Sequence, residues 1–166
     1  SRQPSLNQLQ PVQNNSNPNK IVEGNPDLRP DYSHQISLSY NHWKGLTGSY
    51  IWSNLSYRRV MNPFSNQITY DNFGRTISKT INMDSSVNEF ASLYVGGKIP
   101  IGNTPLGIQI NNSSNYNITN SIIDRLKNTT TTLSQSNEIS LEWETDSTFL
   151  EIGAEISYSK PTNSLN

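Results

Sequence analysis

Glutamates are the residues of this sequence whose type and spacing come closest to a chemical site. Five of them fall on the polar side of the period-two alternation in two neighbouring segments: Glu138, Glu142, Glu144, Glu151 and Glu155. Asp146 lies near the turn between the segments. Paired carboxylates hydrolyse glycosides only in a defined cleft at a defined separation. A solvated polar wall is therefore the simpler interpretation, with a cation-binding or acid–base role as the alternative.

The other reactive residue types predict no catalytic or metal site. His34 and His42 occupy one predicted strand at a separation of roughly 26 Å, at about 3.3 Å per residue, which is too far to share a metal ion. The sequence has no Cys, no Gly-x-Ser-x-Gly elbow and no Gly-rich phosphate loop, and Gly96-Gly97 lies within a predicted strand. We expect no enzymatic activity, no cofactor and no bound metal.

One predicted turn offers the best candidates for ligand contact. These candidates are Tyr70, Asn72, Phe73 and Arg75. They combine aromatic faces with hydrogen-bonding groups at a loop tip, where rigid scaffolds commonly place recognition. The alternative is a loop whose aromatic side chains contact neighbouring loops.

Strands must position all of these residues. Apolar and polar residues alternate with period two over residues 36–41, 91–96, 106–111, 139–144 and 150–159. No window shows a comparable 3.6-residue stripe. We therefore predict an all-β fold, an antiparallel up-and-down meander.

The links between these strands alternate in length. Short links are predicted at 43–45, 102–105 and 146–147, and long connections at 60–84, with a hairpin near 65–82, and at 119–130. Outer-membrane barrels have short turns on one rim and long loops on the other. Predicted strands of about 13 residues exceed the usual 5–6, and about 9–11 tilted residues cross the hydrocarbon layer.

Aromatic residues near the predicted strand ends are placed as in an interfacial girdle. These residues are Tyr40, Trp43, Trp52, Tyr57, Trp143, Phe149 and Tyr158. The pattern alone leaves two alternatives open. One is a fragment of a large transmembrane β-barrel, and the other is a secreted or surface-anchored β-rich adhesin or carbohydrate-binding module.

Composition excludes several classes of protein. Asn, Ser and Thr make up 60 of the 166 residues and only 32% are hydrophobic, which is little for a self-sufficient soluble core. A net charge of −1 leaves no basic field for nucleic acid. No apolar run approaches the roughly 18 residues of a transmembrane helix. The termini read as the middle of a longer protein, so we expect a fragment.

Two segments carry a family resemblance. Leu9-Gln10-Pro11 precedes Gly24-Asn25-Pro26-Asp27-Leu28-Arg29-Pro30-Asp31, and Gly74-Arg75-Thr76 precedes Ile81-Asn82-Met83-Asp84. The chain resembles the barrel of TonB-dependent outer-membrane receptors over essentially its whole length, and most closely the outer-membrane protein beta-barrel family. In that group a Gly-Asn-Pro-x-Leu-x-Pro-Glu motif leads into a descending strand, and Asp31 stands where Glu is commoner. Because Pro26 and Pro30 favour extended backbone before them, we interpret the motif as a stiff connection rather than a ligand contact.

The resemblance implies an organisation and a role. Residues 1–31 would be an extracellular loop, 32–160 barrel strands with about six crossing the membrane, and 161–166 a truncated loop, within a barrel of about 22 strands. The parent protein would import a nutrient or metal chelate across the cell outer membrane.

The implied partners are outer-membrane lipid, a plug domain and TonB, the last two lying outside this chain. A surface lipoprotein is a further candidate, and nucleic acid is not expected. We expect the isolated chain to self-associate through its edge strands.

Overall fold

The structure is a computed structural model that describes residues 1–11, 13–17, 19–45, 48–123 and 125–165. Its elements are α1 (Leu6–Leu9), β1 (Gln13–Asn17), β2 (Lys20–Glu23), β3 (Tyr32–Lys44), β4 (Ser49–Met61), β5 (Phe64–Tyr70), β6 (Thr76–Asn82), β7 (Val87–Pro100), β8 (Leu106–Ile123), β9 (Leu126–Glu144) and β10 (Phe149–Asn163). Among the described residues, no helix has the length and apolar character needed to span a membrane.

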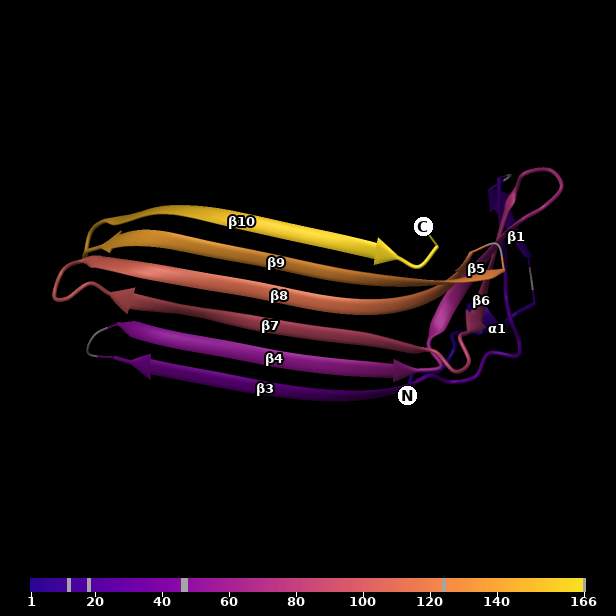
Figure 1. Ribbon diagram of the computed structural model, residues 1–166, viewed down its shortest axis with the longest axis horizontal. Coiled ribbons are helices and arrows are strands. Elements are labelled where there is room, and N and C mark those ends of the chain that lie inside the picture. The colour runs from indigo at the N-terminus through magenta and orange to yellow at the C-terminus, as the bar shows by residue number, and fades with distance from the viewer. Residues whose placement is uncertain (12, 18, 46–47, 124, 166) are drawn as a thin grey trace.

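Six long strands form one antiparallel sheet in the order β3-β4-β7-β8-β9-β10. Figure 1 shows β3 and β10 along the two edges of this layer. Within the described ranges neither edge strand pairs on its outer side, so the sheet is not closed. The predicted all-β antiparallel fold is confirmed, and the open sheet is consistent with a fragment of an outer-membrane barrel.

The remaining elements gather at one end of the long sheet (Figure 1). β5 and β6 form an antiparallel hairpin over the region predicted near 65–82. β5 pairs in parallel with the end of β8, and β6 pairs in parallel with β2, which pairs with β1. We call α1, β1, β2, β5 and β6 the end cap. The opposite end of the sheet holds the links between β3 and β4, β7 and β8, and β9 and β10.

Two predicted loops are strands instead. The long connection expected at 119–130 is wrong, because β8 continues to Ile123 and pairs there with Leu126 at the start of β9. The β-branched run Thr129–Thr132 suits a strand even where no apolar face is required. β10 likewise continues through Pro161 to Asn163, within the predicted 161–166 loop. Proline is tolerated there because β10 is an edge strand.

The segment Gly24–Asp31, which leads into β3, binds the end cap through several contacts, and we call it the clasp. A Cβ atom on Gly24 would lie 1.7 Å from the backbone oxygen of Gln10, so only glycine fits this approach. The amide of buried Asn25 donates to the Thr80 backbone oxygen on β6 over 2.9 Å, and its oxygen accepts from the Asp27 N–H over 3.2 Å. The segment therefore holds β6 while it leads into β3.

A buried carboxylate completes this clasp. Asp31 is only 1% exposed, and its Oδ1 accepts the Arg2 backbone N–H over 3.1 Å. The Arg2 guanidinium lies 2.9 Å from Asp31 Oδ2 and 4.6 Å from the centre of the Phe64 ring. The first residues of the chain are thus fixed to the start of β3 and to β5.

Candidate functional site

Most aliphatic side chains of the long strands share one face of the sheet, and nothing in the described structure covers it. The exposed fractions of four central members are 54% for Ile139, 41% for Leu141, 74% for Ile152 and 75% for Ile156. A soluble binding module would pack these side chains in its interior. The structure therefore does not support the module alternative.

The apolar band crosses the strands obliquely. On β10 the band begins at Leu150. Residues that pair with one another across neighbouring strands form a register row. On β4 the band begins at Ile51, which lies in the same register row as Ala154 of β10. That row is farther from the short links than the row of Leu150. On β3 the band begins at Tyr40, one row farther on, in the row of Ile156. A hydrocarbon layer produces this shape across strands tilted by about 35–45°.

Aromatic residues mark the edges of the band. Tyr57 and Tyr116 share one register row near the end cap, Tyr158 ends the band on β10, and Trp143 stands at the edge near the short links. On the same face, Arg59, Glu89 and Lys160 lie beyond the edge nearest the cap, and Lys44 lies beyond the edge near the short links. The band itself carries no charged side chain among the described residues.

For three residues, the prediction that they belong to the interfacial girdle is wrong. Trp43, Trp52 and Phe149 lie on the opposite, polar face, because they share parity with Asn41 and Glu151 rather than with Tyr40 and Leu150. Tyr40, Tyr57, Trp143 and Tyr158 do lie on the apolar face. A position near a strand end therefore does not determine which face an aromatic side chain occupies.

A small polar cluster interrupts the apolar face on β8 and β9. The Asn112 side chain donates to Asn137 Oδ1 over 2.7 Å, and the Ser114 hydroxyl donates to Asn112 Oδ1 over 3.1 Å. Gln135 is exposed beside them, opposite Ser114. The cluster meets part of its hydrogen-bonding capacity internally, which reduces the cost of placing amides among aliphatic side chains.

The polar face carries two adjacent register rows of uncharged hydrogen-bonding side chains that cross all the long strands. One row is Ser37, Ser56, Ser92, Asn115, Ser134 and Ser159. The other row is Ser39, Asn54, Tyr94, Ser113, Ser136 and Ser157. We call these rows the hydroxyl belt. Apart from Tyr94, these side chains are small, and together they present a broad surface of hydroxyl and amide groups.

Hydrogen bonds fix part of the belt. The Tyr94 hydroxyl donates to Asn115 Oδ1 over 3.1 Å, and the Asn115 amide donates to Ser113 Oγ over 3.2 Å. Ser56 and Ser92 have no hydrogen-bond partner for their hydroxyls within the described part of the chain. The belt therefore contains both fixed and available hydrogen-bonding groups.

A hollow of about 330 Å³ lies where the belt approaches the end cap. Arg58 lines it together with its cross-strand partners Gln35 and Phe90, and Asn117 follows Phe90 in the same row. Tyr94 also lines the hollow from the belt. The arrangement combines one cation, two aromatic rings and several amides in a single concavity.

Arg58 has no carboxylate partner among the residues that the structure describes. Its sequence neighbour Arg59 lies on the opposite face, with Nε 3.8 Å from Glu89 Oε1. The two adjacent guanidinium groups therefore have different surroundings. The guanidinium of Arg58 remains available to an anion.

The five glutamates lie on the polar face of β9 and β10. Lys98 Nζ lies 2.5 Å from Glu142 Oε2 and 2.8 Å from Glu144 Oε2, and Glu155 Oε1 accepts the Ser136 hydroxyl over 2.6 Å. These contacts give three of the carboxylates local structural partners. The described residues contain no group of three or more His, Asp or Glu that could hold a metal ion.

The comparison with protein families matches residues 1–166 to the outer membrane protein beta-barrel family. The chain belongs to this family. Membership implies a barrel protein located in an outer membrane, and the uncovered, oblique apolar band agrees with that location. The comparison with curated proteins and the comparison with solved structures each gave no match.

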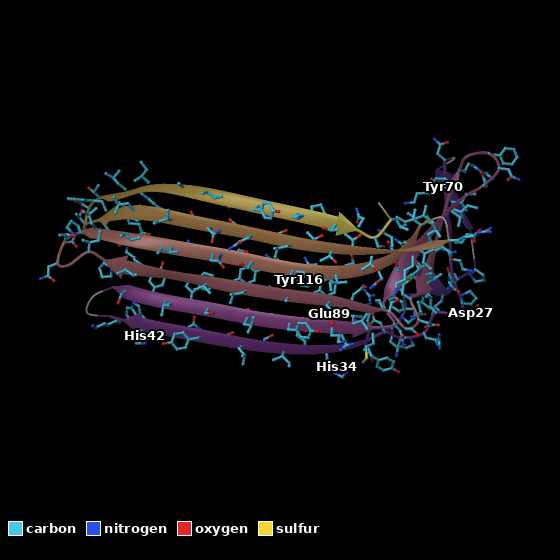
Figure 2. The ribbon with its side chains drawn as sticks, in the orientation of Figure 1. Asp27, His34, His42, Tyr70, Glu89 and Tyr116 are labelled. Carbon is cyan, nitrogen blue, oxygen red and sulfur yellow. The ribbon has the colours of Figure 1, made fainter. Side chains whose placement is uncertain are left out.

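In this outer-membrane family member the predicted ligand-contact residues lie in the end cap, at the tip of the β5–β6 hairpin. Tyr70 and Phe73 are 62% and 85% exposed, and Asn72 is also exposed. Arg75 lies 5.5 Å from the centre of the Phe73 ring, and its Nε donates to Asp71 Oδ2 over 2.7 Å. Figure 2 shows Tyr70 in the cap, apart from the long strands. The structure thus joins Phe73 to Arg75 and separates all four residues from the hollow.

Asp71 organises this tip. Its Oδ1 accepts the backbone N–H groups of Phe73 over 2.8 Å and of Arg75 over 2.9 Å. Partial desolvation raises the pKa of the Asp71 carboxyl, but the hydrogen bonds from Arg75 and Phe73 and the charge of Arg75 outweigh it and hold the pKa below its usual value. Gly74 has a φ of 75°, which glycine adopts without strain.

The two histidines remain far apart, as their spacing predicted. Figure 2 shows His34 and His42 at well-separated positions along β3. They flank the apolar run Ile36–Tyr40 on the same face. Their positions suit the two edges of the apolar band.

Arg58 is not among the site residues predicted from the sequence. Successive residues of a strand point to opposite faces, so the dipeptide Arg58-Arg59 must place one guanidinium on each face. This spacing alone indicates that one arginine lies on the polar face. The faces of β4 could not be assigned, however, because Ile51 and Leu55 fall on one parity while Tyr50 and Trp52 fall on the other. Only the register with β3 and β7 resolves them.

Proposed function

We propose that this chain forms part of the wall of a TonB-dependent outer-membrane transporter that imports a nutrient or metal chelate. The observation that carries the proposal is the pairing of an uncovered, oblique apolar band with a continuous polar face across the same strands. One face would meet lipid acyl chains, and the hydroxyl belt would face the bore.

The energetics of the two faces support this orientation. An Arg or Lys side chain on the lipid face near the midplane costs about 2–4 kcal/mol. The five glutamates and Lys98 lie on the polar face, and the charged residues of the apolar face lie beyond the band. The reverse orientation would place several carboxylates in hydrocarbon.

The end cap would form the outer rim of the pore, with the tip residues Tyr70, Asn72, Phe73 and Arg75 placed to contact the incoming solute. The short links would face the periplasm. A plug domain and TonB outside this chain would supply gating and energy, and a surface lipoprotein could bind at the rim. The chain would act as a passive wall without enzymatic activity, and its unpaired edges would make the isolated piece self-associate.

Cysteine labelling of the full-length protein tests the orientation. Phe73→Cys at the hairpin tip should react with a membrane-impermeant maleimide in intact cells. Ser147→Cys in a short link is the matched position, and it should react only after the outer membrane is permeabilised. Labelling of both positions in intact cells would contradict the proposed topology.

The transport role needs a separate test. Cells that lack the full-length protein and cells that lack TonB should lose uptake of the same compound from a panel of labelled sugars and metal chelates. Uptake that survives loss of TonB would contradict energy-coupled import while leaving the barrel topology intact.

A further inference from the structure

We infer that the hollow around Arg58 binds the carboxylate of a hydroxylated solute, such as a sugar acid, on its way through the bore. This inference rests on the proposed function, because it takes the polar face to line the bore. The site lies in the wall, separate from the hairpin tip.

The guanidinium of Arg58 has no carboxylate partner among the described residues. The carboxylates of the polar face lie on β9 and β10, whereas Arg58 lies on β4. Glu89, the acidic residue nearest in register, lies on the other face with Arg59. Guanidinium groups bind carboxylates through two parallel hydrogen bonds. An anion in the hollow would meet no competing carboxylate from the polar face around Arg58.

Neutral side chains line the hollow around this charge. Gln35 and Asn117 lie in the same register row as Arg58, and Ser56 and Ser92 contribute hydroxyls without other partners in the described structure. These groups can donate to and accept from solute hydroxyls. A bare inorganic anion would leave most of them unused, so the lining favours a solute that carries hydroxyls as well as a carboxylate.

Two aromatic side chains also line the hollow. Phe90 is the cross-strand partner of Arg58, and Tyr94 lies on the same strand with its hydroxyl fixed by Asn115. Ligand sites commonly combine apolar aromatic surface with a few placed polar groups. Phe90 can cover the apolar side of a sugar ring while Arg58 holds its carboxylate.

The test measures binding to the purified full-length protein in detergent with two matched probes, D-glucuronate and D-glucose, by saturation-transfer NMR. The wild type should bind glucuronate at least about tenfold more tightly than glucose. Arg58→Gln should abolish that preference, and Arg58→Lys should retain part of it. Arg59→Gln is the matched control, since its side chain lies on the opposite face, and it should keep the wild-type preference.

Several outcomes would overturn the inference. These are a wild type that binds neither probe or binds both equally, and an Arg58→Gln variant that keeps the preference. A third outcome is that the Arg58→Gln variant binds glucuronate as the wild type does while its plug becomes more sensitive to protease. That result would mean that Arg58 pairs with a carboxylate of the protein and not with a solute. The cysteine labelling described above reports separately on the topology, so failure of this site is distinguishable from failure of the proposed function.

Discussion

Gly96 shows how single residues set the polar face. A Cβ atom at this position would lie 2.6 Å from Cε2 and Nε1 of Trp52 on β4 and 2.5 Å from Asn111 Oδ1 on β8. The missing side chain thus lets the indole lie against the strand. Aromatic cover of a strand glycine is a known way to pin cross-strand register.

Gly96→Val should therefore displace Trp52. We expect a loss of about 1–3 kcal/mol in the free energy of unfolding, the usual range for overpacking, and a red shift of Trp52 emission in a variant whose other tryptophans are replaced by Phe. Gly45→Ala is the control, because its Cβ would lie 3.4 Å from the nearest Trp43 atom, close to ordinary contact. Unchanged emission in Gly96→Val would contradict this packing.

The lowered pKa of Asp71 should make the local stability of the hairpin tip sensitive to acid. Because its pKa is lower in the folded protein than in the unfolded chain, it stabilises the tip above the unfolded pKa of about 3.9. That contribution is lost as pH falls through the folded pKa. Hydrogen exchange should show reduced protection of the Phe73 and Arg75 amides at the acid end. Asp71→Asn should remove this pH dependence, and equal dependence in both proteins would contradict it.

At the scale of elements, the clasp before β3 fixes the end cap. Asn25 donates a hydrogen bond to the backbone of β6, and Asp31 accepts one from the backbone of Arg2 at the start of the chain. The sequence predicted a stiff connection here from its prolines. The partners were not predictable, because contacts between residue 25 and residue 80 depend on where the hairpin folds back.

Asn25→Ala should loosen this clasp. Loss of a buried amide that both donates and accepts should cost about 1–3 kcal/mol locally, which would appear as faster hydrogen exchange in β6. Asn72→Ala is the matched control, since Asn72 is exposed at the tip, and it should leave β6 unchanged. Equal exchange in the two variants would show that Asn25 does not hold the cap.

Strand alternation predicted the two faces well where it was regular. The parity of Ile152 and Glu155 was predicted correctly from β10 alone, since that strand alternates without a break. β4 could not be assigned because its aromatic and aliphatic residues conflict, and Trp52 was misplaced as a result. Register, which creates the hydroxyl belt and the Arg58 hollow, depends on turn positions that alternation does not determine.

At the scale of the whole molecule, one open sheet has an apolar face that the chain itself does not cover. The fold class was predictable because period-two alternation recurs through the chain. The lengths of β8 and β9 were not predictable. Strands that extend past a membrane need no apolar face there, so their polar ends resemble loops in the sequence. The family comparison then explains why the apolar face can remain uncovered within one chain.

A nitroxide scan along β10 in the full-length protein, reconstituted in bilayers, measures directly whether the apolar face meets lipid. Collision with oxygen, which concentrates in lipid, should be high at Leu150, Ile152, Ala154 and Ile156. Collision with a water-soluble nickel chelate should instead be higher at Glu151, Gly153, Glu155 and Ser157, so the two profiles should oscillate out of phase with period two. Low accessibility to both reagents at Ile152 and Ile156 would mean that protein covers this face, and it would contradict the lipid-facing wall.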